Sequence, residues 1–171
     1  MAGIDRDAIQ RRRGSDLAGW PPRYDAGYRP ADGDEHWLPE VECAEPRARD
    51  ALILRKLQAQ IAFAWEHSPF YRRKWEAAGV SPPTLRTLED LARFPVVAKA
   101  ELRESQRAHP PFGDYLCVAP DEVARIHGTS GTTGRPTVFG ITTGDWDRIG
   151  GAHARILWGA DCNHAEGIYG A

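Results

Sequence analysis

A nine-residue segment, Gly128 to Pro136, gathers side chains and backbone groups suited to binding phosphate. Its three glycines recur at every third position, so several backbone N–H groups can turn toward one point. Four hydroxyls can donate to the same point, and one guanidinium adds a fixed positive charge with a two-pronged donor. The segment therefore predicts a cradle for a polyphosphate. Its donors are Thr129, Ser130, Gly131, Thr132, Thr133, Gly134 and Arg135.

The spacing of the glycines excludes two common phosphate-binding loops. The P-loop of NTPases needs a Gly, four residues and then Gly-Lys-Ser/Thr. Here the fifth residue after Gly128 is Thr133, and the fifth after Gly131 is Pro136. The Gly-x-Gly-x-x-Gly pattern of dinucleotide-binding folds does not occur in the segment either. The alternative is a plain connection between two strands, but a hairpin needs only a two-residue turn, which favours phosphate binding.

The run from Ser130 to Pro136, Ser-Gly-Thr-Thr-Gly-Arg-Pro, resembles the phosphate-binding signature of the adenylate-forming (AMP-binding, acyl-CoA synthetase) superfamily. Arg135 stands where that signature usually has Lys, so the charge is kept while its geometry changes. The surrounding chain, over about residues 37–171, is similar to the phenylacetate–CoA ligase family. The segments that carry this similarity are Ser68-Pro69-Phe70-Tyr71-Arg72, Ala78-Gly79-Val80, Leu88-Glu89-Asp90-Leu91, Pro111-Phe112-Gly113, Arg125-Ile126-His127 and Pro136-Thr137-Val138.

The resemblance implies ATP-dependent activation of a carboxylic acid, aryl or arylacetic. In that chemistry the carboxylate attacks the α-phosphorus of ATP, giving acyl-AMP and pyrophosphate. The thiol of coenzyme A then displaces AMP to give the thioester. The resemblance implies that the loop holds the β- and γ-phosphates, with ATP, Mg²⁺ and coenzyme A as cofactors. It implies no catalytic residue in this segment and makes Tyr169 a candidate for the wall of the acyl pocket.

Members of the family are well over twice as long as these 171 residues. The resemblance thus implies the N-terminal portion of an α/β large domain over residues 37–171, after a weakly ordered tail over residues 1–36. We expect such a fragment to be inactive alone, with a C-terminal portion or a second copy as its partner. Two alternatives stay open: an adenylating relative without CoA transfer, and a short non-catalytic nucleotide- or partner-binding protein.

Other potentially reactive side chains form weaker patterns. Cys162 and His164 make a Cys-x-His pair, with His153 upstream, but a tetrahedral zinc site needs a fourth ligand. We therefore expect no metal site there. His127 directly precedes the loop and is a candidate for contact with substrate or nucleotide, although hydroxyls and N–H groups hold phosphate without a base.

The composition is that of an ordinary globular protein, with 42% hydrophobic residues, 27% charged residues and a net charge of −2. That charge gives no reason to expect nucleic acid or an anionic membrane as a partner. The apolar runs are too short to span a membrane, and the first residues lack the apolar core of a secretory signal. Three widely spaced cysteines do not make a disulfide framework, so a cytoplasmic setting is expected.

The pattern of apolar residues predicts the elements that position the loop. Apolar side chains at helical spacing predict a long helix from Pro46 to Glu66, ended by Ser68-Pro69. A second helix follows to Ala78, stopped by Gly79, and its aromatic residues are interpreted as packing residues. The remaining expected elements are a short helix capped by Thr87-Leu88-Glu89-Asp90, a helix over 98–106, strands over 123–127 and 137–142, and a helix over 145–160.

Overall fold

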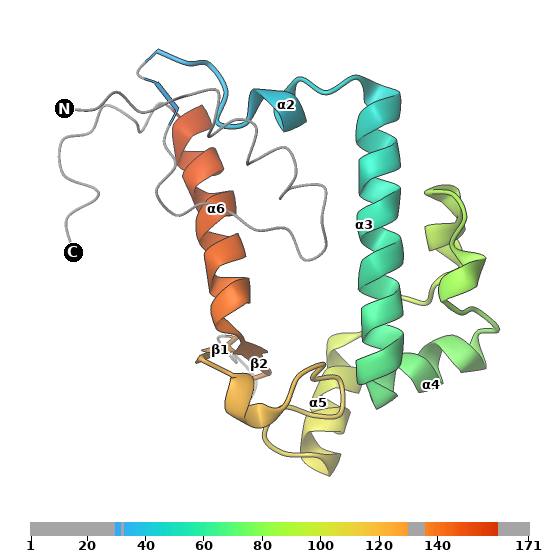
Figure 1. The fold of residues 1–171 in the computed structure, drawn as a ribbon. Helices are drawn as coiled ribbons and strands as arrows, with labels where there is room; N and C mark the ends of the chain where they lie inside the picture. The colour runs from blue at the N-terminus through green and yellow to red at the C-terminus, as the bar shows by residue number, and fades with distance from the viewer. Residues whose placement is uncertain (1–29, 32, 130–135, 161–171) are drawn as a thin grey trace. The chain divides into compact units, whose positions relative to one another are not determined.

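The computed structural model describes residues 30–31, 33–129 and 136–160. Helices dominate the first part, and a hairpin and a final helix follow, which confirms the expected order of elements (Figure 1). No helix among the described residues has the length and apolarity that a membrane crossing requires. The elements are α2 (Pro39–Glu42), α3 (Pro46–His67), α4 (Pro69–Ala77), η1 (Pro82–Thr84), η2 (Glu89–Arg93), α5 (Lys99–Ala108), η3 (Pro120–Glu122), β1 (Arg125–Gly128), β2 (Val138–Ile141) and α6 (Thr143–Gly159).

The chain divides into two compact units. One contains Asp50–Thr143, and therefore most of α3, the helices up to η3 and the hairpin. The other combines the chain up to Arg49 with the chain from Gly144 onward. Most of the expected tail, residues 1–29 and 32, lies outside the described residues, so its boundary at residue 36 stays a prediction.

The core of the larger unit forms where α3 and α4 meet the chain that follows them. Its buried members come from both helices and from residues 80 and 85, and the predicted apolar face of α3 supplies two of them. Trp75 of α4 lies at the centre, 5.5 Å from the ring of Phe94 and 6.4 Å from the ring of Trp65. The interpretation of the α4 aromatics as packing residues is thus confirmed. The buried set is Ile61, Ala64, Trp75, Val80 and Leu85, with Leu54, Leu57, Trp65, Tyr71, Phe94 and Cys117 packed against it.

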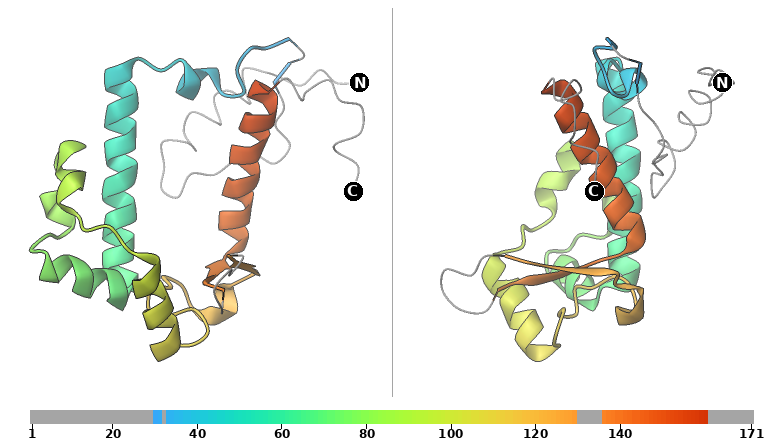
Figure 2. Two further views of the ribbon diagram at one scale, coloured as in Figure 1. Left: turned by 180° about the vertical axis from the view of Figure 1, so that it is seen from behind. Right: turned by 90° about the vertical axis from the view of Figure 1, so that its left-hand side faces the viewer.

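Two residues set the direction of the chain around α4, which turns away sharply from the end of α3 (Figure 2). Ser68 ends α3 and caps α4, because its hydroxyl accepts a hydrogen bond of 3.3 Å from the N–H of Tyr71. Gly79 ends α4 with φ +67°, as expected of a glycine at this position. The N–H of Val80 then bonds back to the carbonyl of Trp75 at 3.0 Å, which directs Val80 into the core.

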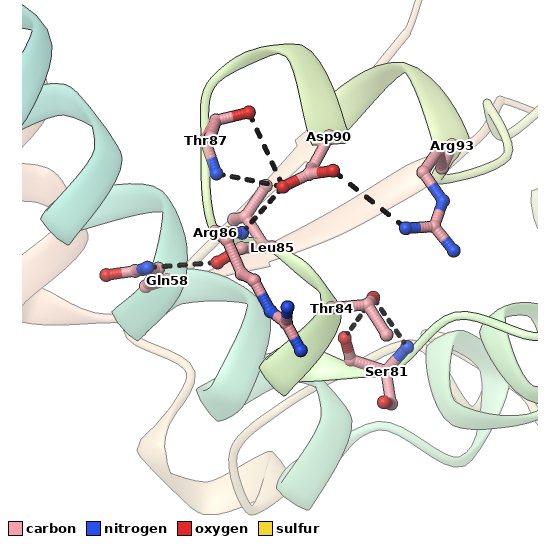
Figure 3. Close-up of polar contacts among 8 residues, drawn as sticks. All are labelled: Gln58, Ser81, Thr84, Leu85, Arg86, Thr87, Asp90 and Arg93. Carbon is pink, nitrogen blue, oxygen red and sulfur yellow. Dashed lines mark hydrogen bonds and ion pairs between the residues drawn. The ribbon is translucent and has the colours of Figure 1, made fainter.

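The segment after α4 is attached to α3 by one side chain. The Nε2 group of Gln58 donates to the carbonyl of Leu85 at 2.9 Å, across 27 residues of sequence, while the Leu85 side chain is buried (Figure 3). Just before it, the Thr84 hydroxyl donates to the carbonyl of Ser81 at 2.6 Å and accepts from the Ser81 N–H at 3.2 Å. These bonds give the 3₁₀ turn η1 its own local support before the chain reaches the core.

The short helix expected after Thr87 is the 3₁₀ helix η2, and its capping group is Asp90 (Figure 3). One oxygen of that carboxylate accepts from the N–H groups of Arg86 and Thr87, both at 2.9 Å. The other oxygen lies 3.9 Å from the Arg93 guanidinium. The backbone bonds from Arg86 and Thr87 hold the pKa of Asp90 below its ordinary value.

The hairpin consists of β1 and β2, paired antiparallel in a two-stranded sheet. Arg125 lies opposite Ile141 at one end of the ladder, and Gly128 lies opposite Val138 at the end next to the loop. The two strands run side by side in the right-hand view of Figure 2. All four residues of β1 are exposed.

The smaller unit has a separate apolar cluster. Trp37, Leu38 and Trp158 are buried together, with the rings of the two tryptophans 5.6 Å apart in an edge-to-face arrangement. The indole N–H of Trp158, near the end of α6, donates to the carbonyl of Asp34 at 2.9 Å. This polar contact and the ring contact together join residues 34–38 to the last turns of α6.

Candidate functional site at the base of the hairpin loop

The central part of the predicted phosphate cradle, Ser130 to Arg135, lies outside the described residues, as do Tyr169, Cys162 and His164. The two ends of the loop are described, and they meet. The N–H of Thr129 donates to the carbonyl of Thr137 at 3.0 Å, and the N–H of Thr137 donates to the hydroxyl of Thr129 at 3.2 Å. The loop therefore leaves and re-enters the hairpin at one point.

Thr129 has two functions at this base. Its backbone N–H and its hydroxyl oxygen close the hairpin, and within the described chain its hydroxyl hydrogen makes no hydrogen bond. The neighbouring Thr137 is completely buried, and its hydroxyl has no hydrogen-bond partner among the described residues. A buried hydroxyl without a partner costs free energy, so the site holds one unsatisfied polar group directly beside the loop.

Two side chains from outside the hairpin fix the start of β2. Gln106 of α5 donates from Nε2 to the carbonyl of Val138 at 2.8 Å. Tyr115 donates from its hydroxyl to the same carbonyl at 2.7 Å. Burial is the main reason that the pKa of Tyr115 is raised to about 12, so its phenol stays protonated and able to donate. These two residues position the exit of the loop.

Sequence reasoning missed both donors. They lie 32 and 23 residues before Val138, and neither belongs to a pattern of regular spacing. Gln106 is the last residue of the helix expected over 98–106, and Tyr115 lies in an irregular segment. Contacts of this kind arise from tertiary packing, which periodicity and turn signals do not encode.

A polar cluster around Asp114 holds the segment that carries Tyr115. Ser105 of α5 donates its hydroxyl hydrogen to the carboxylate of Asp114 at 2.7 Å and accepts the N–H of Asp114 at 2.9 Å. The same carboxylate pairs with Arg73 of α4 at 2.5 Å. The Asp114 carbonyl accepts from the Ser68 hydroxyl at 3.2 Å. The cluster thereby connects α4, α5 and the segment that carries Tyr115.

The charge of Asp114 should make stability depend on pH. Burial by itself would raise its pKa, but the hydrogen bonds from Ser105 and Arg73 outweigh this effect and hold the pKa below its ordinary value. A carboxyl with a lowered folded pKa stabilises the protein above the unfolded pKa, near 4, and that contribution is lost as the pH falls through the folded pKa.

We expect Asp114→Asn to lower the free energy of unfolding by about 1–3 kcal/mol at pH 7, because Arg73 and Ser105 lose their charged partner. The difference from wild type should shrink as the pH falls below about 4. Urea unfolding followed by circular dichroism across this range measures both effects. Asp121→Asn, at an exposed carboxylate, is the control, and identical pH profiles for the Asp114 variant and wild type would contradict the assignment.

Two of the histidines discussed from the sequence, His127 and His153, lie among the described residues. His127 is on β1, exposed, in register with Phe139. His153 lies on α6, with its Nδ1 atom 2.8 Å from the carbonyl of Ile149. No group of three metal-ligating side chains occurs in the described part of the chain.

Comparison with known proteins gives a consistent result. Phenylacetate-coenzyme A ligase of Thermus thermophilus is 43% identical over 121 residues, which is 71% of this chain and 26% of that enzyme. The Escherichia coli phenylacetate-coenzyme A ligase is 40% identical over 132 residues, which is 77% of this chain and 29% of that enzyme. A structure of 2-hydroxyisobutyryl-CoA ligase in complex with 2-HIB-AMP and CoA matches with a TM-score of 0.78 at 56% identity, over 82% of this chain and 30% of that one.

The chain belongs to the adenylate-forming acyl-CoA ligase family. This confirms the resemblance found in the sequence, and the related proteins are acid–thiol ligases. The chain spans under a third of the length of these relatives. No family model matches the chain.

Proposed function

We propose that this acyl-CoA ligase segment holds the β- and γ-phosphates of ATP while a carboxylic acid is activated to acyl-AMP, which coenzyme A then converts to acyl-CoA. The observation that carries the proposal is the closed base of the loop. The Thr129–Thr137 pair brings the two ends of the predicted cradle to one point, and Gln106 and Tyr115 fix the exit. The Thr129 donor at this base is already held in place and need not be reorganised when charge develops on the phosphates.

In this proposal each residue of the loop has a stated task. The hydroxyls of Ser130, Thr132 and Thr133 and the N–H groups of Gly131 and Gly134 donate to phosphate oxygens. Arg135 contributes charge, and the Thr129 hydroxyl hydrogen adds one donor at the base. Mg²⁺ would enter with ATP and offset charge on the phosphates when bound. Positioning and charge stabilisation are the main sources of rate in such transfers.

The acid is proposed to be an aryl or arylacetic acid, in line with the phenylacetate-coenzyme A ligases. A short 2-hydroxy acid is a second candidate, because the solved 2-hydroxyisobutyryl-CoA ligase structures reach 51–56% identity to this chain. An adenylating relative without CoA transfer and a non-catalytic nucleotide-binding protein remain the alternatives. The thermal stabilisation of the chain by phenylacetyl-AMP and by 2-hydroxyisobutyryl-AMP compares the two acids directly.

Arg135 provides the main test of the phosphate role. We expect Arg135→Ala to weaken ATP binding to this chain by at least tenfold in isothermal titration, because it removes the cation of the cradle. Arg135→Lys, which restores the residue usual in the superfamily signature, should stay within about threefold of wild type. Arg86→Ala, at an exposed arginine of the same unit, is the control.

An unchanged ATP affinity in the Arg135→Ala variant would show that the loop does not hold the phosphates. ATP–pyrophosphate exchange provides a second measurement. We expect the 171-residue chain to stay at background in this assay, because it covers under a third of the related enzymes. Exchange clearly above background would contradict the expected inactivity of the isolated chain.

A further inference from the structure

Two segments that carry the family resemblance, over residues 68–72 and 111–113, have no task in the phosphate proposal. The first of them bonds to the backbone of Asp114, the residue that directly follows the second. The carbonyl of Asp114 accepts a hydrogen bond from the N–H of Phe70 and another from the hydroxyl of Ser68, both at 3.2 Å. The start of α4 therefore fixes the peptide group that leads from Asp114 into the next residue.

The turn before that peptide group is held as well. Gly113 has φ +77°, and its N–H donates to the carbonyl of His109 at 2.7 Å. The N–H of Asp114 donates to the hydroxyl oxygen of Ser105, on α5, at 2.9 Å. The backbone of Asp114 is thus bonded to α5 on one side and to α4 on the other, which sets the direction in which Tyr115 leaves the turn.

The side chain of Tyr115 continues this support toward the hairpin. It is buried, and its ring lies 6.1 Å from the ring of Phe70 and 6.3 Å from that of Phe139, on β2. Its hydroxyl donates to the carbonyl of Val138 at 2.7 Å. A ring enclosed in this way on a fixed backbone has little freedom, so the helices determine where the Val138 carbonyl can lie.

The second donor to the same carbonyl, Gln106, is not equivalent to Tyr115. Gln106 is half-buried, and together with Val138 it lines a cavity of about 630 Å³, which is large enough to admit water. A water molecule can therefore replace the Gln106 amide at the carbonyl at low cost. Tyr115 is only 9% exposed, so the loss of its hydroxyl leaves its side of the carbonyl without a donor.

The bond from Tyr115 has a different effect from the bonds at the base of the loop. The bonds between Thr129 and Thr137 close the loop on itself and do not attach it to the helices. Val138 is the next residue after Thr137 and lies opposite Gly128 in the ladder. The bond from Tyr115 to its carbonyl therefore attaches the closed base of the loop to α4 and α5.

We propose that Tyr115 is a positioning residue for the phosphate loop. It holds the loop exit at the Val138 carbonyl, while the start of α4 and the turn at Gly113 hold Tyr115 itself. The inference rests on the proposed function, in which the loop binds the phosphates of ATP. Tyr115 makes no contact with the nucleotide in this account. It acts through the backbone, because the loop donors can converge on the phosphates only when the exit is fixed.

The test begins with isothermal titration of the 171-residue chain with ATP. Tyr115→Phe keeps the ring and removes the hydroxyl, and we expect it to weaken ATP binding about three- to tenfold. Gln106→Met should weaken it less than about threefold, because water can take the place of the amide. Tyr71→Phe removes a hydroxyl from another tyrosine of the same unit and is the matched control, with an unchanged affinity. Thermal unfolding shows that each variant is folded.

Amide hydrogen exchange without ATP provides a second readout, which a purely structural role would not change in this way. The N–H groups of Thr129 and Thr137 are bonded at the base of the loop. In Tyr115→Phe they should exchange at least about fivefold faster, because the exit is no longer held. A general loss of stability would speed the N–H of Val80, bonded to the carbonyl of Trp75 in the core, by as much.

Faster exchange at Thr129 and Thr137 together with weaker ATP binding supports the inference. An ATP affinity that falls in Arg135→Ala but is the same in Tyr115→Phe and Tyr71→Phe sustains the proposed function and overturns only the inference. Unchanged exchange at the two threonines overturns the inference whatever the ATP affinity. An ATP affinity that is indifferent to Arg135 removes the proposed function, and the role of Tyr115 in phosphate binding with it.

Discussion

Replacing Trp75 with alanine should lower the free energy of unfolding by about 3–5 kcal/mol, the cost found for large aromatic residues removed from cores. Trp75 is buried at the centre of the main core, with rings of Tyr71, Phe94 and Trp65 around it at 5.2–6.4 Å. Its neighbours come from α3, α4 and the segment after η2, so they cannot all close over the space left behind. The lost burial and the residual cavity both add to the cost.

Urea unfolding followed by far-ultraviolet circular dichroism measures this change without relying on tryptophan fluorescence. Trp75→Phe should lower the free energy of unfolding less than Trp75→Ala does, because it keeps an aromatic ring against Phe94. Val96→Ala is the control, since Val96 is 88% exposed and should change the free energy of unfolding by at most about 0.5 kcal/mol. A loss below about 1 kcal/mol for Trp75→Ala would mean that this cluster is not the core of the unit.

Gly113→Ala should lower the free energy of unfolding by about 3 kcal/mol, an unusually large effect for the addition of one methyl group. Gly113 has φ +77°, where a side chain is strained by about 1–2 kcal/mol. A Cβ atom there would lie 2.5 Å from the Ser105 hydroxyl and 2.7 Å from the Tyr115 ring. Neither side chain can move away freely, because Ser105 is hydrogen-bonded to Asp114 and Tyr115 is hydrogen-bonded to the carbonyl of Val138.

Gly79→Ala is the matched control for the backbone part of this effect. Gly79 also has a positive φ, +67°, but nothing lies within 4 Å of the place that a Cβ atom would take there. We expect it to cost only the backbone strain, about 1 kcal/mol. The difference between the two variants, measured by the same urea titration, isolates the contact with Ser105 and Tyr115. Equal losses of unfolding free energy for the two variants would show that Ser105 and Tyr115 can move to admit the methyl group at no measurable cost.

The elements were predictable because their ends are marked locally. Pro46 at the start of α3, Ser68 between α3 and α4, and Gly79 after α4 each act through the backbone within a few residues. The hairpin was predictable from the apolar runs on both sides of the loop, although its strands are shorter than expected at both outer ends. The capped start expected at Thr87-Leu88-Glu89-Asp90 is present, since the Asp90 carboxylate accepts the N–H of Thr87 at 2.9 Å.

The arrangement around the loop was not predictable in the same way. The pairing of Ser105 with Asp114, the bond from Gln58 to Leu85 and the two donors to Val138 join positions 9–32 residues apart. Each depends on how helices pack, and none has a characteristic residue spacing. The loop composition predicted a phosphate-binding chemistry, whereas the support of the loop exit by Tyr115 emerged only from the packing of residues 113–115 against the hairpin.

The hydrogen bonds to the Val138 carbonyl affect where a further strand can pair with this sheet. Successive carbonyls of a strand point to opposite edges of the strand. The Thr137 carbonyl points inward to Thr129, and the Val138 carbonyl therefore points outward. Gln106 and Tyr115 occupy both of its lone pairs. A further strand along the outer edge of β2 would have to displace them at this position. Strand addition along the outer edge of β2 is therefore hindered at the loop exit by these two side chains.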